Sequence, residues 1–322
     1  KTFTGLTIDS WEVGLQNWTA GLEKTFSEYF GYSMLPYFPC LTGRVVGSER
    51  ETERFLGDFR RLLAKLQAEN YYGHFRTLAH KYGLEVSFET YGPGLMDSYA
   101  SGKYADIPMS EFWAYDDMHK PTSYANTRRN KLMASIAHTW DKKVVAAESF
   151  TSHLKYGYGA WRGHPYALKP CGDRMFTTGI NRFVFHTSAH QPWNNAVPGA
   201  TLGGVGFHFT RGITWAEQAK AWTDYLARCQ YLLQEGRFSA DILYFLRGEV
   251  PPAYGPHELH FNPPIPKGYD YDSCNYEVIE NAQVVNGEIT LPSGMSYRLL
   301  VLPPWDSMTP EMVEKIASLV ED

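Results

Sequence analysis

The chain has 322 residues, which is enough to bury a full hydrophobic core and more than a single domain usually contains. Charged residues make up 20% of the sequence and the formal net charge is -5, so the composition excludes the basic surface that nucleic-acid binding requires. No apolar run approaches the roughly 18 residues that a membrane-spanning helix needs.

The chain opens with a predicted strand, Gly5–Ile8, and polar side chains follow it at once. Asp9, Trp11 and Glu12 stand where the apolar run ends. A strand that only packs in a core does not need two acids and an indole at its exit, whereas a strand that leads into a pocket does. The sequence therefore predicts a site at this end of the strand.

A helical region comes next, and a capping box, Ser48-x-x-Glu51, marks the start of its main helix. Apolar residues recur behind the capping box at helical spacing, and the region runs on to about Gly83. Further helices are predicted over residues 130–140 and 215–235.

Five more strands are predicted, and each ends in a polar or aromatic cluster. The strands cover residues 84–88, 104–109, 143–147, 180–185 and 203–207. Alternation of strands with helices predicts a parallel sheet. Functional groups at the C-terminal end of every strand favour a (β/α)8 TIM-type barrel, because a doubly wound sheet gathers them at one switch point.

Six strands are two fewer than a full barrel contains. We therefore expect the first strands to precede Lys1 and the chain to be part of a longer protein. An open barrel leaves an unpaired edge, which predicts poor solubility for residues 1–322 alone. At the other end, residues 314–322 stop in the middle of an amphipathic helix.

The sequence predicts three segments. Residues 1–248 form the partial barrel, with a further strand at 240–246, and residues 249–275 are a linker rich in Pro, Gly and Tyr. Residues 276–322 are the start of a second, truncated α/β domain.

Four glutamates lie at strand ends: Glu12, Glu89, Glu111 and Glu148. A structural salt bridge is the plainer explanation for any one of them. Four converging on one barrel mouth favour two working carboxyl groups, one that protonates a leaving oxygen and one that activates water or attacks directly. We expect all four glutamates to line one concavity, together with two histidines that also follow strands, His186 and His208.

Two acidic pairs offer hard oxygen ligands for a calcium ion. Asp9 lies beside Glu12, and Asp116 is followed by Asp117. The second pair is the weaker candidate, because it also fits a solvated loop.

The histidines allow two interpretations. His186 and His190 form H-x-x-x-H, but the stretch follows a strand, contains Pro192 and lacks the glutamate of a zinc protease, so a zinc pair is disfavoured. Hydrogen bonding of sugar hydroxyls by His186 and His208 is favoured, with a core histidine as the alternative for each.

Aromatic residues make up 15% of the chain, including 22 tyrosines and 9 tryptophans. Aromatic faces beside hydroxyl groups suit partly apolar ligands such as sugar rings, and an aromatic-rich core is the alternative explanation. A glycosylation sequon over residues 17–19 contains Trp18, but its place in the first strand's loop favours a role in the pocket. The four cysteines are far apart and form no zinc or redox motif.

Several long motifs, in order, resemble glycoside hydrolase family 106, the α-L-rhamnosidases. The likeness covers about residues 5–246. The motifs are Asp9-Ser-Trp-Glu-Val-Gly14, Gln16-Asn-Trp-Thr19, Phe30-Gly-Tyr32 with Leu35-Pro36, Glu53-Arg-Phe-Leu56 with Asp58-Phe-Arg60, Pro108-Met-Ser-Glu-Phe-Trp113, Ala146-Ala-Glu-Ser-Phe-Thr151 and Phe185-His-Thr-Ser-Ala-His-Gln-Pro-Trp193.

The resemblance implies a barrel that removes terminal α-L-rhamnose by inversion, with a calcium ion in the site. It places the functional glutamates at Glu12, Glu111 and Glu148. We expect Glu12 to be the general acid, Glu148 the general base, and Glu111 a ligand of substrate or calcium, with Asp9 as a second calcium ligand. The remaining expected substrate contacts are Trp11, Trp18, Trp113, His186, His190, Trp193 and His208.

The family also implies a carbohydrate substrate, such as a rhamnose-containing pectic oligosaccharide, and a periplasmic or secreted location. Two other classes stay open. A carbohydrate-binding domain would use the same aromatic residues without needing acids on several strands. A non-catalytic assembly domain would pair its strand-end acids with Lys or Arg.

Overall fold

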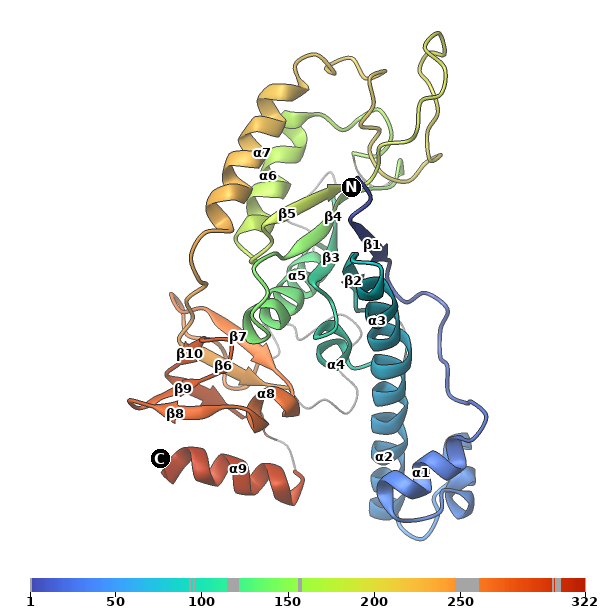
Figure 1. Cartoon of the computed structure of the whole chain (residues 1–322), viewed down its shortest axis with the longest axis vertical. Helices are drawn as coiled ribbons and strands as arrows, with labels where there is room; N and C mark the ends of the chain where they lie inside the picture. Colours follow the sequence, from blue (N-terminus) through green and yellow to red (C-terminus); the bar gives the residue numbers. More distant parts are fainter. Residues whose placement is uncertain are drawn as a thin grey trace.

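The structure is a computed structural model that describes residues 2–92, 94, 96–114, 122–155, 158–246, 261–302, 304 and 308–321. A curled parallel sheet with its helices lies at the centre of Figure 1, and a smaller α/β unit lies below it. A long helical arm runs down beside both of them. The arm is formed by α2 and α3, with α1 at its far end.

The central sheet has five parallel strands in sequence order, β1-β2-β3-β4-β5. Helices and long loops alternate with the strands, so the predicted α/β class with a parallel sheet is confirmed, in the form of a half-barrel. The strands are β1 Gly5–Ile8, β2 Glu85–Glu89, β3 Ile107–Trp113, β4 Ala146–Thr151 and β5 Arg182–Phe185.

The two faces of this sheet differ in polarity because successive side chains alternate between them. The outer face carries Phe88, Phe112 and Phe183, which pack in the two main hydrophobic clusters of the half-barrel. The inner face carries polar groups such as Thr7 and Ser87, whose hydroxyls lie 3.1 Å apart on paired positions of β1 and β2.

The helices cover the outer face and extend into the arm. α3 packs on β2, α5 on β3 and α6 on β4. The elements are α1 Leu22–Phe30, η1 Leu35–Thr42, α2 Glu49–Gln67, the π-helical turn η2 Ala68–Gly73, α3 His74–Lys81, α4 Ser98–Gly102, α5 Thr122–Thr139, α6 Pro165–Phe176 and α7 Ala219–Leu233.

The capping box at the start of α2 forms as predicted, because the Ser48 hydroxyl accepts a hydrogen bond from the Glu51 amide at 3.2 Å. α6 was not predicted. Pro165 at its first turn and Pro170 inside it conceal the apolar periodicity, although Leu168, Cys171 and Met175 are buried.

The predicted sixth strand, residues 203–207, is not part of the sheet. Gly203 and Gly206 have positive φ angles, which breaks an extended run. The segment instead forms isolated bridges to the loop after β4, from Val205 to His153 and from Phe207 to Ala160. It therefore connects the chain after β4 to the chain after β5 without extending the sheet.

A second unit follows α7. Its parallel sheet has the order β11-β6-β7, and its antiparallel sheet has the order β10-β9-β8. Its elements are β6 Ile242–Phe245, β7 Tyr271–Cys274, α8 Tyr276–Glu280, β8 Gln283–Val285, β9 Glu288–Thr290, β10 Ser296–Tyr297, β11 Leu299–Val301 and α9 Pro310–Glu321.

Strand pairing places the change of sheet earlier in the chain than the predicted boundary at residue 248. β6 lies before that boundary, yet it pairs with β7 and β11 of the second unit. β7 lies within the predicted linker. α5 joins the two units, since Lys131 contacts Asp270 at 2.6 Å and His138 contacts the fully buried Asp272 at 2.9 Å.

Within the described residues, no helix combines the length and the apolar character needed to cross a bilayer.

Candidate active site

Three carboxylates converge at the C-terminal ends of neighbouring strands. Asp9 follows β1, Glu89 ends β2 and Glu148 lies on β4. Each offers an oxygen atom, and these atoms all lie within 4.8 Å of one another. Asp9 is exposed, Glu148 is half-buried and Glu89 is buried.

Strand register explains why these side chains meet. Ile8 pairs with Phe88, so Asp9 and Glu89 occupy the next positions on the same face. Glu111 pairs directly with Glu148. Glu89 pairs with Met109, two residues before Glu111, so Asp9 and Glu89 lie one inward position short of Glu111 and Glu148. The four acids form one group on the inner face of the sheet, and this group is called the carboxylate row below.

Glu89 holds its proton more tightly than an ordinary glutamate. Burial raises the pKa of Glu89 well above its usual value, and the carboxylates of Asp9 and Glu148 raise it further. The Tyr91 hydroxyl donates to Glu89 at 2.5 Å, which lowers the pKa without reversing the shift. Three crowded carboxyl groups thus favour either a shared proton or a bound cation.

Glu111 is held differently, although it lies on the same face of the sheet and pairs with Glu148. Its carboxylate forms an ion pair with Arg129 of α5, and both side chains are largely buried. The Arg129 guanidinium also lies over the Tyr91 ring, 5.4 Å from its centroid. Among the described residues, no Lys or Arg forms an ion pair with Asp9, Glu89 or Glu148.

The loops after β1 and β2 are fastened together at Trp11. Its amide donates to the Tyr91 carbonyl at 2.9 Å, and its indole Nε1 donates to the Gly14 carbonyl at 2.7 Å. Gly92 has φ +142, and a Cβ there would lie 2.0 Å from the Trp11 carbonyl oxygen. The glycine after Tyr91 is therefore required for the close approach of the two loops.

β4 carries a local irregularity next to Glu148. The pairing of β3 with β4 shifts register between Glu111 and Trp113, and Phe150 has φ +62. A bulky residue in this region is strained, and its full burial against Phe112 and Trp222 offsets the cost. The Thr151 hydroxyl donates to the Glu148 carboxylate just beyond this bulge.

Glu12 lies outside the three-carboxylate cluster. It is exposed on the loop after β1, where the Ser10 hydroxyl donates to its carboxylate at 3.2 Å. Trp18 is farther along the same loop, half exposed and in edge contact with Phe38. The structure thus brings Asp9, rather than Glu12, directly against Glu148.

His186 and His208 follow β5 and the segment 203–207. The Nδ1 atoms of both are buried and have no hydrogen-bond partner among the described residues. Burial lowers the pKa of His208, and its ring meets Trp161 edge-on at 4.5 Å. Imidazoles with an unpaired ring nitrogen suit hydrogen bonding to a neutral ligand.

The other predicted contacts are more peripheral. His190 and Trp193 are exposed on the loop after β5, where Arg211 donates to the Trp193 carbonyl at 2.8 Å. Trp113 is half-buried at the end of β3. Asp116 and Asp117 lie outside the described residues.

The donor chemistry of the cluster fits a calcium ion. Carboxylate oxygens are the ligands that calcium prefers, and Asp9, Glu89 and Glu148 supply three of them from separate strands. Asp9 was predicted as a ligand. Glu111 was also predicted, but its carboxylate is engaged by Arg129.

Sequence reasoning missed Glu89 as a member of the innermost cluster and Arg129 as the partner of Glu111. Glu89 was recognised only as one strand-end acid among four. The available signal was its position directly after the apolar Val86 and Phe88 of the same strand. Arg129 gave no signal, since its contact depends on helix α5 packing over β3.

Two proteins that this chain resembles are named as glycosidases. The chain is 44% identical over 324 residues to a Formosa agariphila protein named "Putative beta-glucuronidase", covering 100% of this chain and 26% of that relative. The solved structure of a rhamnosidase from a Novosphingobium species matches with a TM-score of 0.87 and 37% identity, over 98% of this chain and 30% of that chain. The chain thus spans less than a third of either relative.

The model of glycoside hydrolase family 106, described as alpha-L-rhamnosidase, matches residues 1–322. The match covers the half-barrel, the carboxylate row and the second unit. Together with the acids gathered at the strand ends, it shows that this chain belongs to glycoside hydrolase family 106.

Proposed function

We propose that the chain carries the catalytic carboxylates of an α-L-rhamnosidase that removes terminal α-L-rhamnose with inversion. The observation that carries the proposal is the gathering of Asp9, Glu89 and Glu148 on the inner face of the sheet, at its C-terminal end. Carboxyl groups are the reacting groups of glycoside hydrolysis, and this end of the strands is where barrel enzymes place them.

Glu148 is assigned as the general base. Its carboxylate points from β4 into the row of acids, and small neighbours, Ala146 and Ala147, flank it in the strand. Glu12 is assigned as the general acid on the loop after β1, from which it can approach a bound glycoside. Inversion requires room for one water between the sugar and the base, which corresponds to carboxyl groups roughly 6.5–9.5 Å apart.

We propose that Asp9 and Glu89 hold a calcium ion next to Glu148. When bound, the ion neutralises the crowded carboxylates and can take hydroxyl oxygens of the substrate as further ligands. Glu111 is proposed to contact the substrate with its carboxylate. The ion pair with Arg129 fixes the position of that carboxylate.

A β-glucuronide is the alternative substrate, because the Formosa agariphila relative carries the name "Putative beta-glucuronidase". Where no cation is bound, the acids of the site would repel the carboxylate of a glucuronide. Arg129, which lies beside the acids, is already paired with Glu111. A neutral deoxy sugar such as rhamnose avoids this repulsion, so the charge of the site favours a rhamnoside.

The test uses the full protein with 4-nitrophenyl α-L-rhamnopyranoside and 4-nitrophenyl β-D-glucuronide. We expect turnover of the rhamnoside only, and proton NMR of the first product should show β-L-rhamnose. Glu148→Gln should abolish turnover, whereas Glu85→Gln, which removes an exposed carboxylate from the other end of β2, should not. Turnover of the glucuronide instead, or α-L-rhamnose as the first product, would overturn the substrate or the stereochemical assignment respectively.

The carbohydrate-binding alternative predicts that both substrates are inert while sugar still binds. A periplasmic or secreted location, and a pectic source of the rhamnoside, follow from the proposed substrate and are part of the same proposal.

A further inference from the structure

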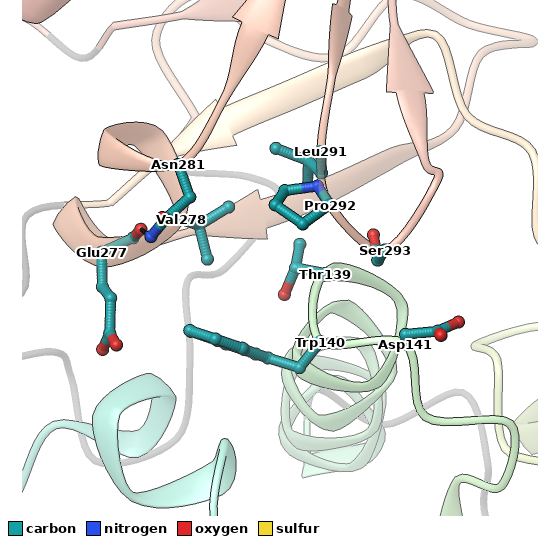
Figure 2. Close-up of a pocket in the computed structure, with 9 residues that line it drawn as sticks. All are labelled: Thr139, Trp140, Asp141, Glu277, Val278, Asn281, Leu291, Pro292 and Ser293. Carbon is teal, nitrogen blue, oxygen red and sulfur yellow. Dashed lines mark hydrogen bonds between the residues drawn. The ribbon is translucent and has the colours of Figure 1, made fainter.

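A pocket of about 460 Å³ lies between α5 and the second unit, away from the carboxylate row. Thr139 at the end of α5 and the next two residues, Trp140 and Asp141, line one side, and Glu277 and Val278 of α8 line another. The turn after β9 contributes residues 291–293 (Figure 2). This volume is within the range of small-molecule sites.

The pocket and the carboxylate row lie toward opposite ends of α5. Arg129, which holds Glu111, is on α5, and Trp140, which follows the helix directly, lies about 16 Å farther along its axis at 1.5 Å per residue. Because α5 runs back from the end of β3 to the start of β4, the pocket lies toward the N-terminal ends of the strands. It is therefore separate from the proposed catalytic site.

Trp140 forms a flat aromatic wall of the pocket. Figure 2 shows its indole facing a gap, with Val278, Leu291 and Pro292 on the far side. The Lys103 ammonium lies over the ring, 5.9 Å from its centroid. An aromatic plate opposite aliphatic groups suits a ligand with an apolar face.

The indole also has an unused hydrogen-bond donor. The Nε1 atom of Trp140 is buried and has no acceptor among the described residues. A buried donor without an acceptor is unfavourable, so an acceptor supplied by a ligand at this ring would be favoured.

Charge narrows the ligand class. Glu277 is already neutralised, because both its oxygens accept hydrogen bonds from Lys103 at 2.8 Å. Asp141, Asn281 and Ser293 supply hydrogen-bonding groups at the rim, and no Lys or Arg is among the described residues that line the pocket. An anionic ligand lacks a partner here, whereas a neutral ring with several hydroxyl groups finds both the aromatic plate and the polar rim.

We propose that this pocket is a second carbohydrate-binding site that takes a neutral pyranose, with one face of the sugar on Trp140 and its hydroxyls at the rim. The inference does not depend on the catalytic roles proposed above. Its function would be to hold a further sugar unit of a long substrate at a distance from the reacting bond.

The test uses the full protein with Glu148→Gln to prevent turnover and with 5-fluorotryptophan in place of tryptophan. Trp140→Phe identifies the Trp140 fluorine resonance by its loss. Methyl α-L-rhamnopyranoside and methyl β-D-glucopyranoside are titrated separately, and glycerol serves as the control for a non-cyclic polyol. We expect a saturable change at the Trp140 resonance with at least one of the two glycosides and none with glycerol.

Asn281→Phe, at an exposed position of the rim, should fill the pocket mouth and weaken the response at least fivefold, while Asn281→Ser should keep most of it. The proposal is overturned if the Trp140 resonance stays unchanged with both glycosides, if glycerol moves it equally, or if Asn281→Phe leaves the response intact. A response at Trp11 without one at Trp140 would sink this inference and leave the proposed catalytic function standing.

Discussion

Glu111 and Glu148 occupy directly paired positions on β3 and β4, yet they have opposite electrostatic environments. Glu111 is locked by Arg129, whereas Glu148 faces Asp9 and Glu89 with no paired cation among the described residues. Two identical side chains on paired positions therefore differ in role: Glu111 is fixed by an ion pair, whereas Glu148 lies among carboxyl groups without a paired cation.

The Glu111–Arg129 pair should be worth more to stability than a surface ion pair. Arg129→Met leaves a largely buried carboxylate without its cation, so we expect a loss of about 3–5 kcal/mol in the free energy of unfolding. Adding Glu111→Gln should recover part of that loss. Urea unfolding of both single variants and the double variant measures the coupling, and strictly additive losses would contradict a direct pair.

The acid and base assignments predict different responses to leaving group. An aryl rhamnoside with a good leaving group needs little protonation, so Glu12→Gln should keep much of its rate on that substrate, and Glu148→Gln should not. Steady-state kinetics on aryl rhamnosides of graded leaving-group acidity provide the comparison. If Glu148→Gln is the variant that recovers, the two roles are exchanged.

Calcium binding should stabilise the folded protein through the carboxylate cluster. A ligand at about 100 times its dissociation constant adds about 2.7 kcal/mol, so added calcium should raise the melting temperature. Asp9→Asn should remove most of this increase, because it deletes an oxygen ligand. Glu111→Gln should keep it, since that carboxylate is engaged by Arg129. Equal melting curves for wild-type protein with calcium and with a chelator would exclude the ion site.

Glu89 should make stability depend on pH. The raised pKa means that the folded protein keeps this proton over a range in which the unfolded chain has lost it. Folding therefore becomes less favourable as the pH rises from the unfolded-state value of about 4.3 toward the raised folded value. Glu89→Gln removes this term, so the stability of the variant relative to wild type should increase with pH across that window.

Chemical unfolding in calcium-free buffer at several pH values measures this difference, with Glu85→Gln as the control for loss of a carboxylate from the same strand. A constant difference between Glu89→Gln and wild type would show that Glu89 does not hold the extra proton.

Gly92 should be needed for the geometry of the first loop. Gly92→Ala places a Cβ 2.0 Å from the Trp11 carbonyl oxygen, so the loop that carries Asp9 and Glu12 must shift. We expect at least tenfold lower activity. Gly14→Ala is the matched control, because Gly14 also has a positive φ but its added Cβ meets nothing within 4 Å, which leaves only the backbone cost of about 1–2 kcal/mol. Similar activity losses in both variants would point to strain alone.

The sequence by itself determined the parallel α/β class, the first strand, the capped helix and the acids at the strand ends. These features are local: apolar runs, a capping box and a polar residue where each run stops are readable without knowing what packs where. The family motifs also lie in continuous stretches, so their match needed no coordinates.

Only the tertiary structure decided which acids meet. Side chains on separate strands approach through register, which depends on pairing between Ile8 and Phe88 and between Glu111 and Glu148 across long intervals of chain. The same cause explains why Glu89 joins the cluster. Arg129 could be found only after α5 was packed on β3, because a helix that crosses a sheet brings together residues whose sequence separation carries no periodic signal.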